Sequence, residues 1–343
     1  MGPLPARILI VSDAWLPQMN GVVRTLQAVS AELRAMGHVV EIVGPDRFVT
    51  IPCPTYPDIR LSLLPARRLN RMIEDFAPEA LHIATEGPLG IAARAWALRR
   101  GCAFITAFHT RFPEYVNART GIPVGWIYPW LRRFHNAGQG MMVATASLRE
   151  EMEQRGFRAL RDWSRGVDLE LFRPAPARDW GLKRPVFAYV GRVAVEKNIA
   201  AFLDLDLPGS KVVVGDGPQL AALRRRYPGV HFTGPLFGEE LAAAYAGSDV
   251  LVFPSLTDTF GLVVLEALAC GTPVAAFDVT GPRDILAGAC GHVGAIGPDL
   301  RLAARAALDA DRAACRAHAE RFSWRACAQS FLTHLVPLGG HRP

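Results

Sequence analysis

The 343-residue sequence lacks the patterns that mark several protein classes. Its six cysteines are scattered, form no CxxC pair and join no histidine cluster, so neither a zinc site nor a disulfide framework is expected. No stretch of about 18 apolar residues is present, which predicts a chain that does not span a membrane. The apolar run at residues 7–12 is too short for a secretory signal and is typical of a first strand, so a reducing cytoplasm is the expected location.

Two further motifs are absent, and each absence argues against a class of enzyme or cofactor. No GxGxxG motif follows the first strand, which disfavours a dinucleotide-dependent dehydrogenase. The sequence also offers no acidic cluster of the metal-binding kind, so neither a metal ion nor another cofactor is expected.

Lysine is scarce, with three in the whole chain and none in residues 1–165. That half holds 20 arginines against 14 acidic residues, a net charge of +6, whereas residues 166–343 hold 18 of each sign. The excess indicates an anionic partner, such as a membrane surface or an acidic acceptor. The alternative is that this chain simply uses arginine at every basic surface position, in which case the arginines indicate no partner. Because no nucleic-acid-binding motif is present, nucleic acid is not an expected partner.

Length and composition indicate about two globular domains with sizeable cores, since half of the residues are hydrophobic and a fifth are charged. Short apolar runs alternate with segments of helical periodicity throughout, as in parallel α/β sheets. We therefore predict two doubly wound, Rossmann-like α/β domains, over residues 1–165 and 166–320. Residues 321–343 are predicted to form a helix that crosses back to the first domain.

The stretch 253–274 has the order strand, loop, helix, strand. Asp258 lies in the loop at the strand's carboxyl end, and Glu266 follows in an otherwise apolar helix. Ligands bind at the carboxyl ends of strands in such sheets, and a helix N-terminus beside a glycine suits a phosphate. Asp258 could equally be a helix cap and Glu266 a solvated residue. A carboxylate among apolar neighbours is nevertheless costly unless something binds it.

Three other strand ends are followed by candidate binding residues. Arg192 and Lys197 follow the strand 186–190, where two cations beside a glycine can hold a diphosphate, although a surface turn is the alternative. Gly21 lies at the corner between the first strand and the first helix, and His109 follows the strand 104–108. A glycine at such a corner lets the backbone approach a phosphate.

Two segments of the first half could contact a membrane, and a third is rich in proline. Residues 117–135 interleave aromatic residues with arginines, which suits a membrane interface or an amphiphilic acceptor, or else a helical lid packed on its own domain. The candidates for such a contact are Trp126, Tyr128, Trp130, Arg132 and Arg133. Residues 66–76 form a basic amphipathic helix that either lies on an anionic membrane or is an ordinary packed helix. The proline-rich residues 44–65 are expected to be a loop or short edge strands.

The spacing Asp258-x7-Glu266, the run TDTFG and the run GR…EKN at 191–198 resemble the donor motifs of retaining glycosyltransferases of family 4. This family has the GT-B fold, in which two Rossmann-like domains face each other across a cleft. Its commoner first acid is Glu, so Asp258 is a departure, as is the single glycine, Gly21, where the family has two.

The resemblance implies a role for each site residue. Arg192, Lys197 and Gly21 would hold the donor diphosphate, and His109 would lie beside the sugar. Asp258 would bind sugar hydroxyls, and Glu266 would accept from the ribose. The helix start would supply backbone N–H donors at Phe260, Gly261, Leu262 and Val263. The family needs no metal, and the leaving phosphate itself takes the acceptor's proton.

The expected activity is transfer of a hexose from a nucleotide sugar to a lipid such as diacylglycerol, at the inner face of the cell membrane. A UDP-sugar is the favoured donor and GDP-mannose the next. A soluble or polysaccharide acceptor is the main alternative. An NDP-sugar epimerase and a non-catalytic nucleotide-sugar binder remain alternatives of another class.

Overall fold

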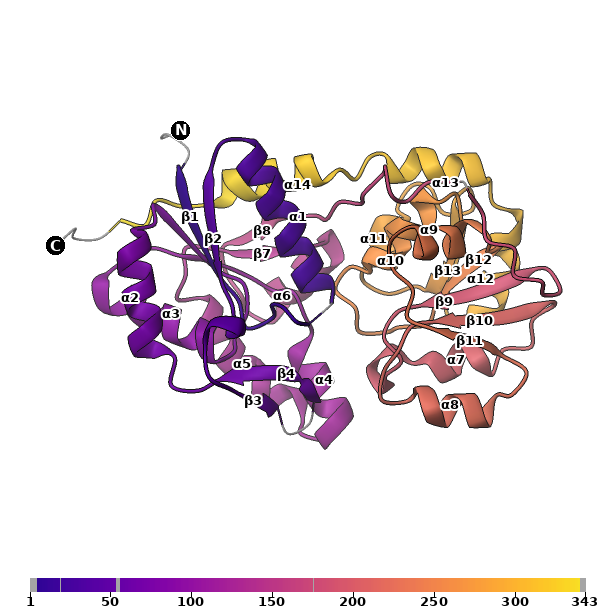
Figure 1. The fold of residues 1–343 in the computed structure, drawn as a ribbon, viewed down its shortest axis with the longest axis horizontal. Helices are drawn as coiled ribbons and strands as arrows, with labels where there is room; N and C mark the ends of the chain where they lie inside the picture. Colours follow the sequence, from indigo (N-terminus) through magenta and orange to yellow (C-terminus); the bar gives the residue numbers. More distant parts are fainter. Residues whose placement is uncertain (1–4, 19, 54–55, 175, 340–343) are drawn as a thin grey trace. The chain divides into compact units, whose positions relative to one another are not determined.

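The computed structural model describes residues 5–18, 20–53, 56–174 and 176–339, and the chain divides into two compact units (Figure 1). Unit 1 comprises Met1–Ser164 and Trp324–Pro343, and unit 2 comprises Arg165–Ser323. The division therefore falls one residue before the boundary expected from the sequence. The chain returns to unit 1 at Trp324 rather than at residue 321.

The sheet of unit 1 has six parallel strands in the order β2-β1-β5-β6-β7-β8. Helices cover both of its faces, so most of its strands are mainly apolar, and Ile8, Leu9 and Ile10 are fully buried. The strands are β1 (Arg7–Val11), β2 (Val39–Val43), β5 (Ala80–Ile83), β6 (Ile105–Ala107), β7 (Met141–Val143) and β8 (Leu160–Asp162).

The helices of unit 1 are α1 (Gly21–Ala35), α2 (Ala66–Phe76), α3 (Pro88–Arg100), α4 (Phe112–Thr120), α5 (Val124–His135), α6 (Ala146–Gln154) and α14 (Trp324–His334). A short 3-10 helix, η1 (Pro45–Arg47), precedes a separate antiparallel pair, β3 (Thr50–Cys53) and β4 (Tyr56–Ser62). The proline-rich segment thus contains a two-stranded hairpin outside the main sheet.

Helix α14 belongs to the core of unit 1. It packs against α1, and Phe331 is fully buried among residues that include Ile8 and Leu26. The indole N–H of Trp163 donates to the carbonyl of Cys327 at 3.1 Å. Residues far apart in the sequence therefore complete one hydrophobic core.

The sheet of unit 2 has six parallel strands in the order β11-β10-β9-β12-β13-β14. This is the dinucleotide-binding order, which reverses between β9 and β12. The strands are β9 (Val186–Val190), β10 (Ser210–Val214), β11 (His231–Gly234), β12 (Val250–Phe253), β13 (Val274–Phe277) and β14 (Gly294–Gly297). Both units are doubly wound α/β structures, as the sequence predicts.

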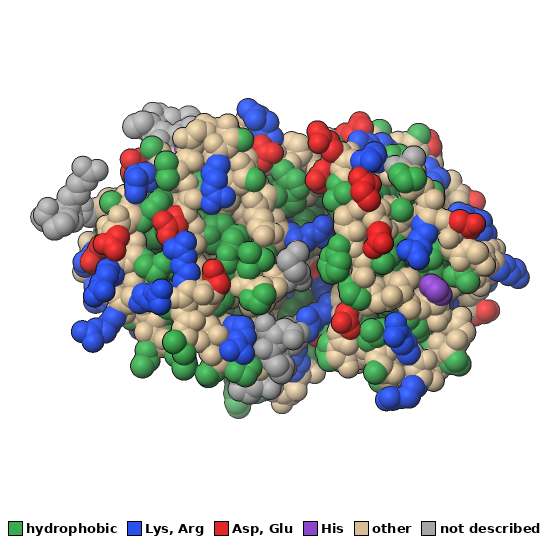
Figure 2. All heavy atoms as spheres, viewed as in Figure 1, with side chains coloured by type: hydrophobic (Ala, Val, Ile, Leu, Met, Phe, Trp, Pro, Cys, Tyr) green, Lys and Arg blue, Asp and Glu red, His purple; other side chains and the backbone are tan. Residues whose placement is uncertain are grey.

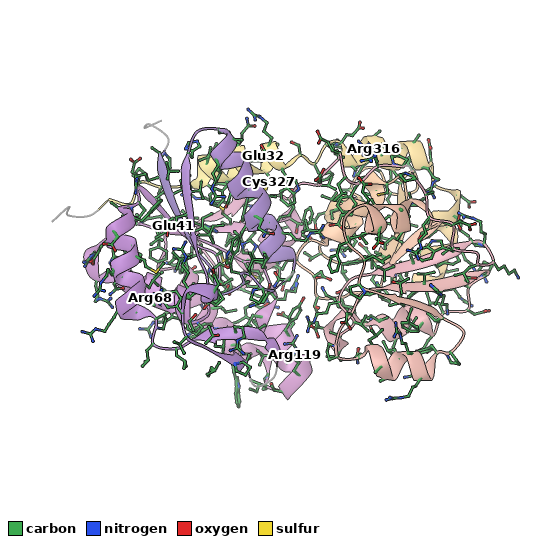
Figure 3. All side chains as sticks on the ribbon, in the orientation of Figure 1. Glu32, Glu41, Arg68, Arg119, Arg316 and Cys327 are labelled. Atoms are coloured by element: carbon green, nitrogen blue, oxygen red, sulfur yellow. The ribbon has the colours of Figure 1, made fainter. Side chains whose placement is uncertain are left out.

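The helices of unit 2 are α7 (Ile199–Leu203), α8 (Leu220–Arg226), α9 (Gly238–Ala246), α10 (Leu262–Ala269), α11 (Pro282–Ile285), α12 (Leu300–Ala306) and α13 (Arg312–Ala319), with 3-10 turns η2 (Val195–Lys197) and η3 (Ala307–Asp309). Arg316 of α13, labelled in Figure 3, donates to the carbonyls of Leu169, Phe172 and Ala269. These bonds tie the segment that enters unit 2 to the end of α10.

Candidate active site

The loops that follow β9 and β12 carry most of the residues predicted to bind a donor. β9 ends at Val190 and β12 ends at Phe253, and the two strands pair directly. The strand order reverses between them. Ligands of open parallel sheets bind outside the carboxyl ends of the strands at such a reversal, so the topology of unit 2 selects this edge.

Lys197 and Asp258 meet at this edge although 61 positions separate them in the sequence. The ammonium Nζ of Lys197 donates to Oδ1 of Asp258 at 2.5 Å, and the two side chains are only 21% and 16% exposed. Oδ2 of Asp258 is buried and has no hydrogen-bond partner among the described residues. The carboxylate therefore keeps one oxygen that can accept from a ligand hydroxyl.

Two further bonds hold the loops together around this pair. The hydroxyl of Thr257 donates to the carbonyl of Glu196 at 3.2 Å, and the amide of Asn198 donates to the carbonyl of Pro254 at 3.1 Å. Asn198 has a φ of +52°, which asparagine tolerates better than most residues. The relative position of Lys197 and Asp258 is thus fixed by backbone contacts on both sides.

Arg192 lies at the same edge, directly after β9. Burial lowers the pKa of its guanidinium, although the charges of Glu196 and Asp216 act in the opposite direction. The group stays cationic, and its partial burial strengthens its attraction for an anion because solvent screening is reduced. Arg192 and Lys197 therefore both lie in the loop after β9, as predicted.

Glycines allow the loops after β9 and β10 to pack backbone against backbone. A Cβ atom on Gly215 would lie 1.9 Å from the carbonyl oxygen of Gly191, and one on Gly217 would lie 2.4 Å from that of Val193. Both positions also have φ above +140°. Only glycine fits such an approach, which sets the path of the loop that carries Arg192.

Helix α10 begins at the end of the loop that carries Asp258. Gly261 precedes the helix with a φ of +95°, and Phe260 before it is buried. Leu262 and Val263 form the first turn and are half-buried. The N–H groups of a first turn have no partner within the helix and carry partial positive charge, so this turn can receive an anionic or hydroxyl oxygen.

Glu266 lies in α10 and is buried, 4% exposed. The phenol of Tyr245 in α9 donates to its Oε2 at 2.8 Å, and Tyr245 is itself fully buried. The carboxylate is therefore held in one orientation. Sequence reasoning missed Tyr245. The only signal was a hydroxyl-bearing aromatic residue in the apolar helix that precedes β12.

His109 and Gly21 lie in unit 1, where each follows the carboxyl end of a parallel strand. The ring of His109 is nearly buried and meets the indole of Trp163 edge-on, with centroids 5.5 Å apart. At the start of α1, the side chain of Asn20 accepts from the N–H groups of Val22 and Val23 at 3.0 and 3.1 Å. Two of the amides that a phosphate near Gly21 would use are thus already bonded.

Asp13 is a buried acid at this edge that the sequence did not single out. Its carboxylate accepts from the N–H groups of Leu89 and Gly90 and so caps α3. Burial raises its pKa, whereas these backbone bonds act to lower it. A Cβ on Gly87 would lie 2.4 Å from the carboxyl carbon, so glycine is required there. Asp13 therefore has a structural role.

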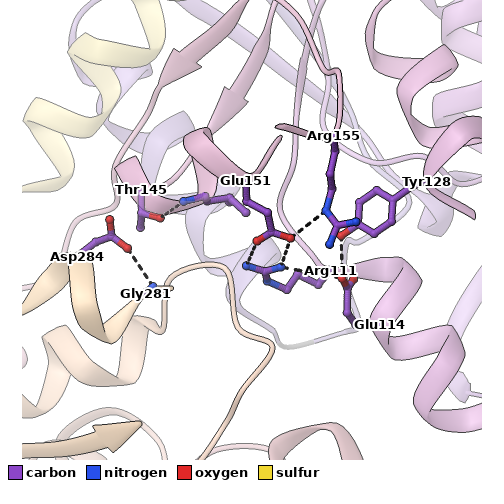
Figure 4. Close-up of polar contacts among 9 residues, drawn as sticks. Arg111, Glu114, Tyr128, Thr145, Glu151, Arg155, Gly281 and Asp284 are labelled. Atoms are coloured by element: carbon purple, nitrogen blue, oxygen red, sulfur yellow. Dashed lines mark hydrogen bonds and ion pairs between the residues drawn. The ribbon is translucent and has the colours of Figure 1, made fainter. Parts of the chain in front are cut away.

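A charged network follows His109 in the chain (Figure 4). Arg111 contacts Glu151 at 2.6 Å, and Arg155 contacts the same carboxylate at 3.0 Å. Burial opposes ionisation of Glu151, but the two arginines outweigh it and lower its pKa. The phenol of Tyr128 donates to Glu114 at 2.7 Å. This network joins α4, α5 and α6 beside the segment that carries His109.

Tyr128 is a correction to the predicted membrane or acceptor surface. Its side chain is buried against Phe157 and other apolar residues, so it is part of the core and not of a surface. Trp126 is 78% exposed and Trp130 42% exposed, on the same helix. Arg132 and Arg133 are exposed as well. Helix α5 thus packs one side on its own unit and presents the other to solvent.

Among the described residues, no group of three His, Cys, Asp or Glu side chains could hold a metal ion. Within the same residues, no helix combines the length and apolar character that crossing a membrane requires.

Comparison with known families matches both parts of the chain. Residues 19–171 match the family described as Glycosyltransferase Family 4, and residues 184–308 match the family described as Glycosyl transferases group 1.

Curated relatives extend this result. The chain is 33% identical to the GDP-mannose-dependent alpha-mannosyltransferase of Mycobacterium tuberculosis, over 82% of this chain and 81% of that protein. It is 31% identical to the sulfoquinovosyl transferase SQD2 of Arabidopsis thaliana, over 82% of this chain and 61% of that protein. It is 25% identical to the alpha-monoglucosyldiacylglycerol synthase of Streptococcus pneumoniae, over 79% of this chain and 70% of that protein.

Solved structures share the fold. Sucrose-phosphate synthase from Thermosynechococcus elongatus superposes with a TM-score of 0.71 at 21% identity, over 94% of this chain and 96% of that one. HepE from Anabaena, solved with UDP and glucose, gives 0.67 at 14% identity, over 95% and 98%. Together with the strand orders of the two units, these findings confirm the predicted fold class. The chain is therefore a glycosyltransferase with the GT-B fold and belongs to glycosyltransferase family 4.

Proposed function

We propose that this glycosyltransferase moves a hexose from a nucleoside-diphosphate sugar to a lipid hydroxyl, such as that of diacylglycerol, with retention of anomeric configuration and without a metal ion. The observation that carries the donor part is the contact between Lys197 and Asp258 at the point where the strand order of unit 2 reverses. A cation, an acid and a helix N-terminus meet there, which suits a ligand with both phosphates and sugar hydroxyls.

The chemistry assigned to each residue follows from its type and place. Arg192 and Lys197 bind the diphosphate and offset the negative charge that grows as the sugar leaves. The first turn of α10 adds N–H donors. Oδ2 of Asp258 accepts from a sugar hydroxyl, and Glu266, oriented by Tyr245, accepts from the ribose.

The residues of unit 1 complete the proposal. His109 contacts the sugar, and the backbone at Gly21 contacts the phosphates. The leaving phosphate takes the proton of the acceptor hydroxyl on the same face of the sugar, which accounts for retention without an enzymatic nucleophile.

Two observations support the proposal of a lipid acceptor, namely the exposed side chains of α5 and the names of the relatives. The exposed Trp126 and Trp130 with Arg132 and Arg133 suit an anionic interface, where aromatic rings lie at headgroup level. The name of the pneumococcal relative specifies diacylglycerol. We propose that the protein acts as a peripheral enzyme on the inner face of the cell membrane.

The donor is tested by thermal stabilisation with UDP, GDP, ADP and dTDP. The sequence favours a UDP-sugar, whereas the mycobacterial relative is named for GDP-mannose, so both bases belong in the panel. A nucleotide at 100 times its Kd should add about 2.7 kcal/mol. The gain should disappear in Arg192→Met and Lys197→Met but persist in Arg224→Met, which alters an exposed arginine of α8. A panel without any shift would refute a nucleotide-sugar donor.

The acceptor is tested by transfer to diacylglycerol in detergent micelles with UDP-glucose and GDP-mannose. The expected product is a glycolipid whose anomeric configuration by NMR matches that of the donor, at a rate unchanged by EDTA. A product of inverted configuration, or transfer only to soluble sugars, would contradict the proposal. Formation of a new nucleotide sugar without acceptor would indicate an epimerase.

A further inference from the structure

A buried histidine of α5 holds a carboxylate at the carboxyl end of β5. His135 is 2% exposed, and its Nε2 lies 3.0 Å from Oε1 of Glu86, in the segment that follows β5. Its Nδ1 lies 2.9 Å from the hydroxyl of Thr106 in β6. Apolar rings surround the imidazole, with centroids 5.2, 5.9 and 6.2 Å away, namely those of Phe134, Phe157 and Phe108. An apolar side chain would serve packing better here, so the polar pair needs another explanation.

The hydrogen bonds of His135 determine how Glu86 is held. An ionised carboxylate only accepts, so Nε2 carries a hydrogen and donates to Oε1 of Glu86. In the neutral ring, Nδ1 accepts from the hydroxyl of Thr106. When the ring is protonated, Nδ1 donates instead, and that hydroxyl can turn to the carbonyl of Gly140, 3.3 Å away. Both nitrogens of the buried ring are therefore satisfied in either state, and Glu86 keeps its donor.

The second carboxylate oxygen of Glu86 is open to a ligand. The side chain is 15% exposed, and His135 is its hydrogen-bond partner among the described residues. Oε2 is not among the buried polar atoms, so it reaches solvent. A carboxylate that is fixed on one side and open on the other can accept from a ligand hydroxyl with little loss of side-chain entropy.

The strand order of unit 1 places Glu86 between residues already assigned to the reaction. Strand β5 pairs in parallel with β1 on one side and with β6 on the other. Gly21 lies in the segment after β1, and His109 follows β6 at the same edge. Glu86 follows the strand between them. It therefore lies at the edge of unit 1 where the proposed function places the transferred sugar.

The charge at this edge differs from that of unit 1 as a whole. Residues 1–165 have a net charge of +6, and Figure 2 shows basic side chains spread over the visible face of unit 1. Glu86 instead lies near another acid. Burial raises the pKa of Asp13, and the charge of Glu86 raises it further. Such an edge repels a phosphate and accepts an uncharged hydroxyl, so it suits the acceptor better than the donor diphosphate.

The proton balance of the reaction decides which hydroxyl Glu86 can bind. In the proposed function, the attacking hydroxyl passes its proton to the leaving phosphate. Its hydrogen therefore points to the phosphate and is not available to Glu86. The carboxylate can then accept only from a second hydroxyl of the acceptor, next to the attacking one.

We propose that Glu86 binds this second hydroxyl, so that the enzyme favours an uncharged acceptor lipid whose head group carries two neighbouring hydroxyls. Monoacylglycerols and glycolipids have such a head group, whereas diacylglycerol has a single hydroxyl. His135 is a positioning residue, since it orients the carboxylate and does not touch the acceptor. This inference rests on the proposed function, which assigns His109 to the transferred sugar and a lipid as the acceptor.

Rates of transfer to matched acceptors test this assignment. In micelles of an uncharged detergent, 1-monoacylglycerol is compared with diacylglycerol and with phosphatidylglycerol, which has two neighbouring hydroxyls beside a phosphate. Glycerol and 1-propanol form a soluble pair. The variants are Glu86→Ala, His135→Phe and His135→Gln. The matched control is Glu79→Gln, which alters an exposed acid at the other end of β5 and keeps an oxygen that accepts from Ala6.

We expect the wild type to have a kcat/KM for monoacylglycerol at least about tenfold above that for either other lipid. Glu86→Ala should remove most of this preference by raising the KM for monoacylglycerol, while the KM for the donor changes by less than about twofold. His135→Phe should reduce the preference roughly threefold, and His135→Gln should restore it because an amide can still donate to Glu86. Glu79→Gln should behave like the wild type. Every variant should keep its stabilisation by nucleotide, which shows that it is folded.

A wild type that uses monoacylglycerol and diacylglycerol equally well would overturn the assignment. So would a Glu86→Ala variant that loses both activities in the same proportion. A higher KM for the donor in that variant would place Glu86 against the transferred sugar and would also overturn it. Failure of the proposed function gives a different result. If no lipid is an acceptor, the lipid acceptor is refuted, and the ratio of glycerol to 1-propanol in the wild type and in Glu86→Ala decides on Glu86.

Discussion

Replacing Tyr245 by phenylalanine tests how the site in unit 2 is held. The substitution removes one hydroxyl and leaves the ring, so no large cavity forms. The hydroxyl donates to a buried, charged carboxylate at 2.8 Å, and the two side chains are 0% and 4% exposed. A hydrogen bond to a charged group contributes about 1.5–3 kcal/mol, and burial places this one away from solvent screening.

We therefore expect Tyr245→Phe to lower the free energy of unfolding by about 2 kcal/mol. For a unit of this size that corresponds to a fall in Tm of roughly 4–8 °C. Because Glu266 loses the donor that orients it, affinity for the nucleoside diphosphate should fall as well, by about three- to tenfold. Urea unfolding gives the first quantity and isothermal titration with UDP or GDP gives the second.

Tyr227→Phe is the matched control in the same unit. The phenol of Tyr227 also donates to a carboxylate, that of Asp204 at 2.5 Å, but this pair lies at the surface. Its removal should cost less than about 1 kcal/mol and leave nucleotide affinity unchanged. If Tyr245→Phe is no more destabilising than Tyr227→Phe and binds nucleotide normally, then Tyr245 does not orient Glu266 and the reasoning is wrong.

Other substitutions probe the backbone and the charges. Gly281→Ala should lower the free energy of unfolding in urea by about 3 kcal/mol or more, because its Cβ would lie 2.4 Å from the carbonyl oxygen of Phe260. Gly288 has a similar positive φ but open space around it, so Gly288→Ala should lower the same free energy by about 1 kcal/mol. The pKa of Glu151 is lowered in the folded state, so its ion pairs stabilise the fold above about pH 4.5. This stabilisation is lost as the pH falls through the folded pKa. The difference in free energy of unfolding between the wild type and Arg111→Met should therefore shrink between about pH 7 and about pH 3.5. Asp258→Asn should bind nucleoside diphosphate roughly three- to tenfold more tightly by titration, because Lys197 is released, while initial rates of transfer fall at least about 100-fold. A variant that binds more weakly would contradict this use of the ion pair.

The fold follows from sequence because its signals are local. Most strands of the two sheets are short apolar runs, whereas the edge strands β8 (Leu-Arg-Asp) and β14 (Gly-Ala-Ile-Gly) are not and were not predicted. The rule that ligands bind at the carboxyl ends of strands then placed Arg192, Lys197 and Asp258 at one edge of one sheet. The structure brings Lys197 and Asp258 into contact because β9 and β12 are neighbours, and that adjacency follows from the dinucleotide-binding strand order.

The sequence could not predict side-chain contacts between elements that are far apart in the chain, because these contacts depend on how the elements pack. Asp13 caps a helix that begins 75 positions later, and Tyr245 reaches Glu266 from another helix. No pattern within a window of residues encodes either contact. The prediction that Tyr128 lies on a membrane or acceptor surface was wrong for a related reason. Aromatic residues occur on both sides of α5, and only the packing of the helix decides that Trp126 is exposed and Tyr128 buried.

The contact between Lys197 and Asp258 bears on how the donor site works before any ligand arrives. Lys197 stabilises the Asp258 carboxylate by an ion pair in the loop before α10. In the proposed function, the same cation binds the diphosphate. On this proposal, donor binding exchanges one set of electrostatic contacts for another and does not simply add new ones. A short acid such as Asp258, held by the loops on either side, keeps Lys197 in place during this exchange, so little reorganisation remains for the step in which the sugar leaves.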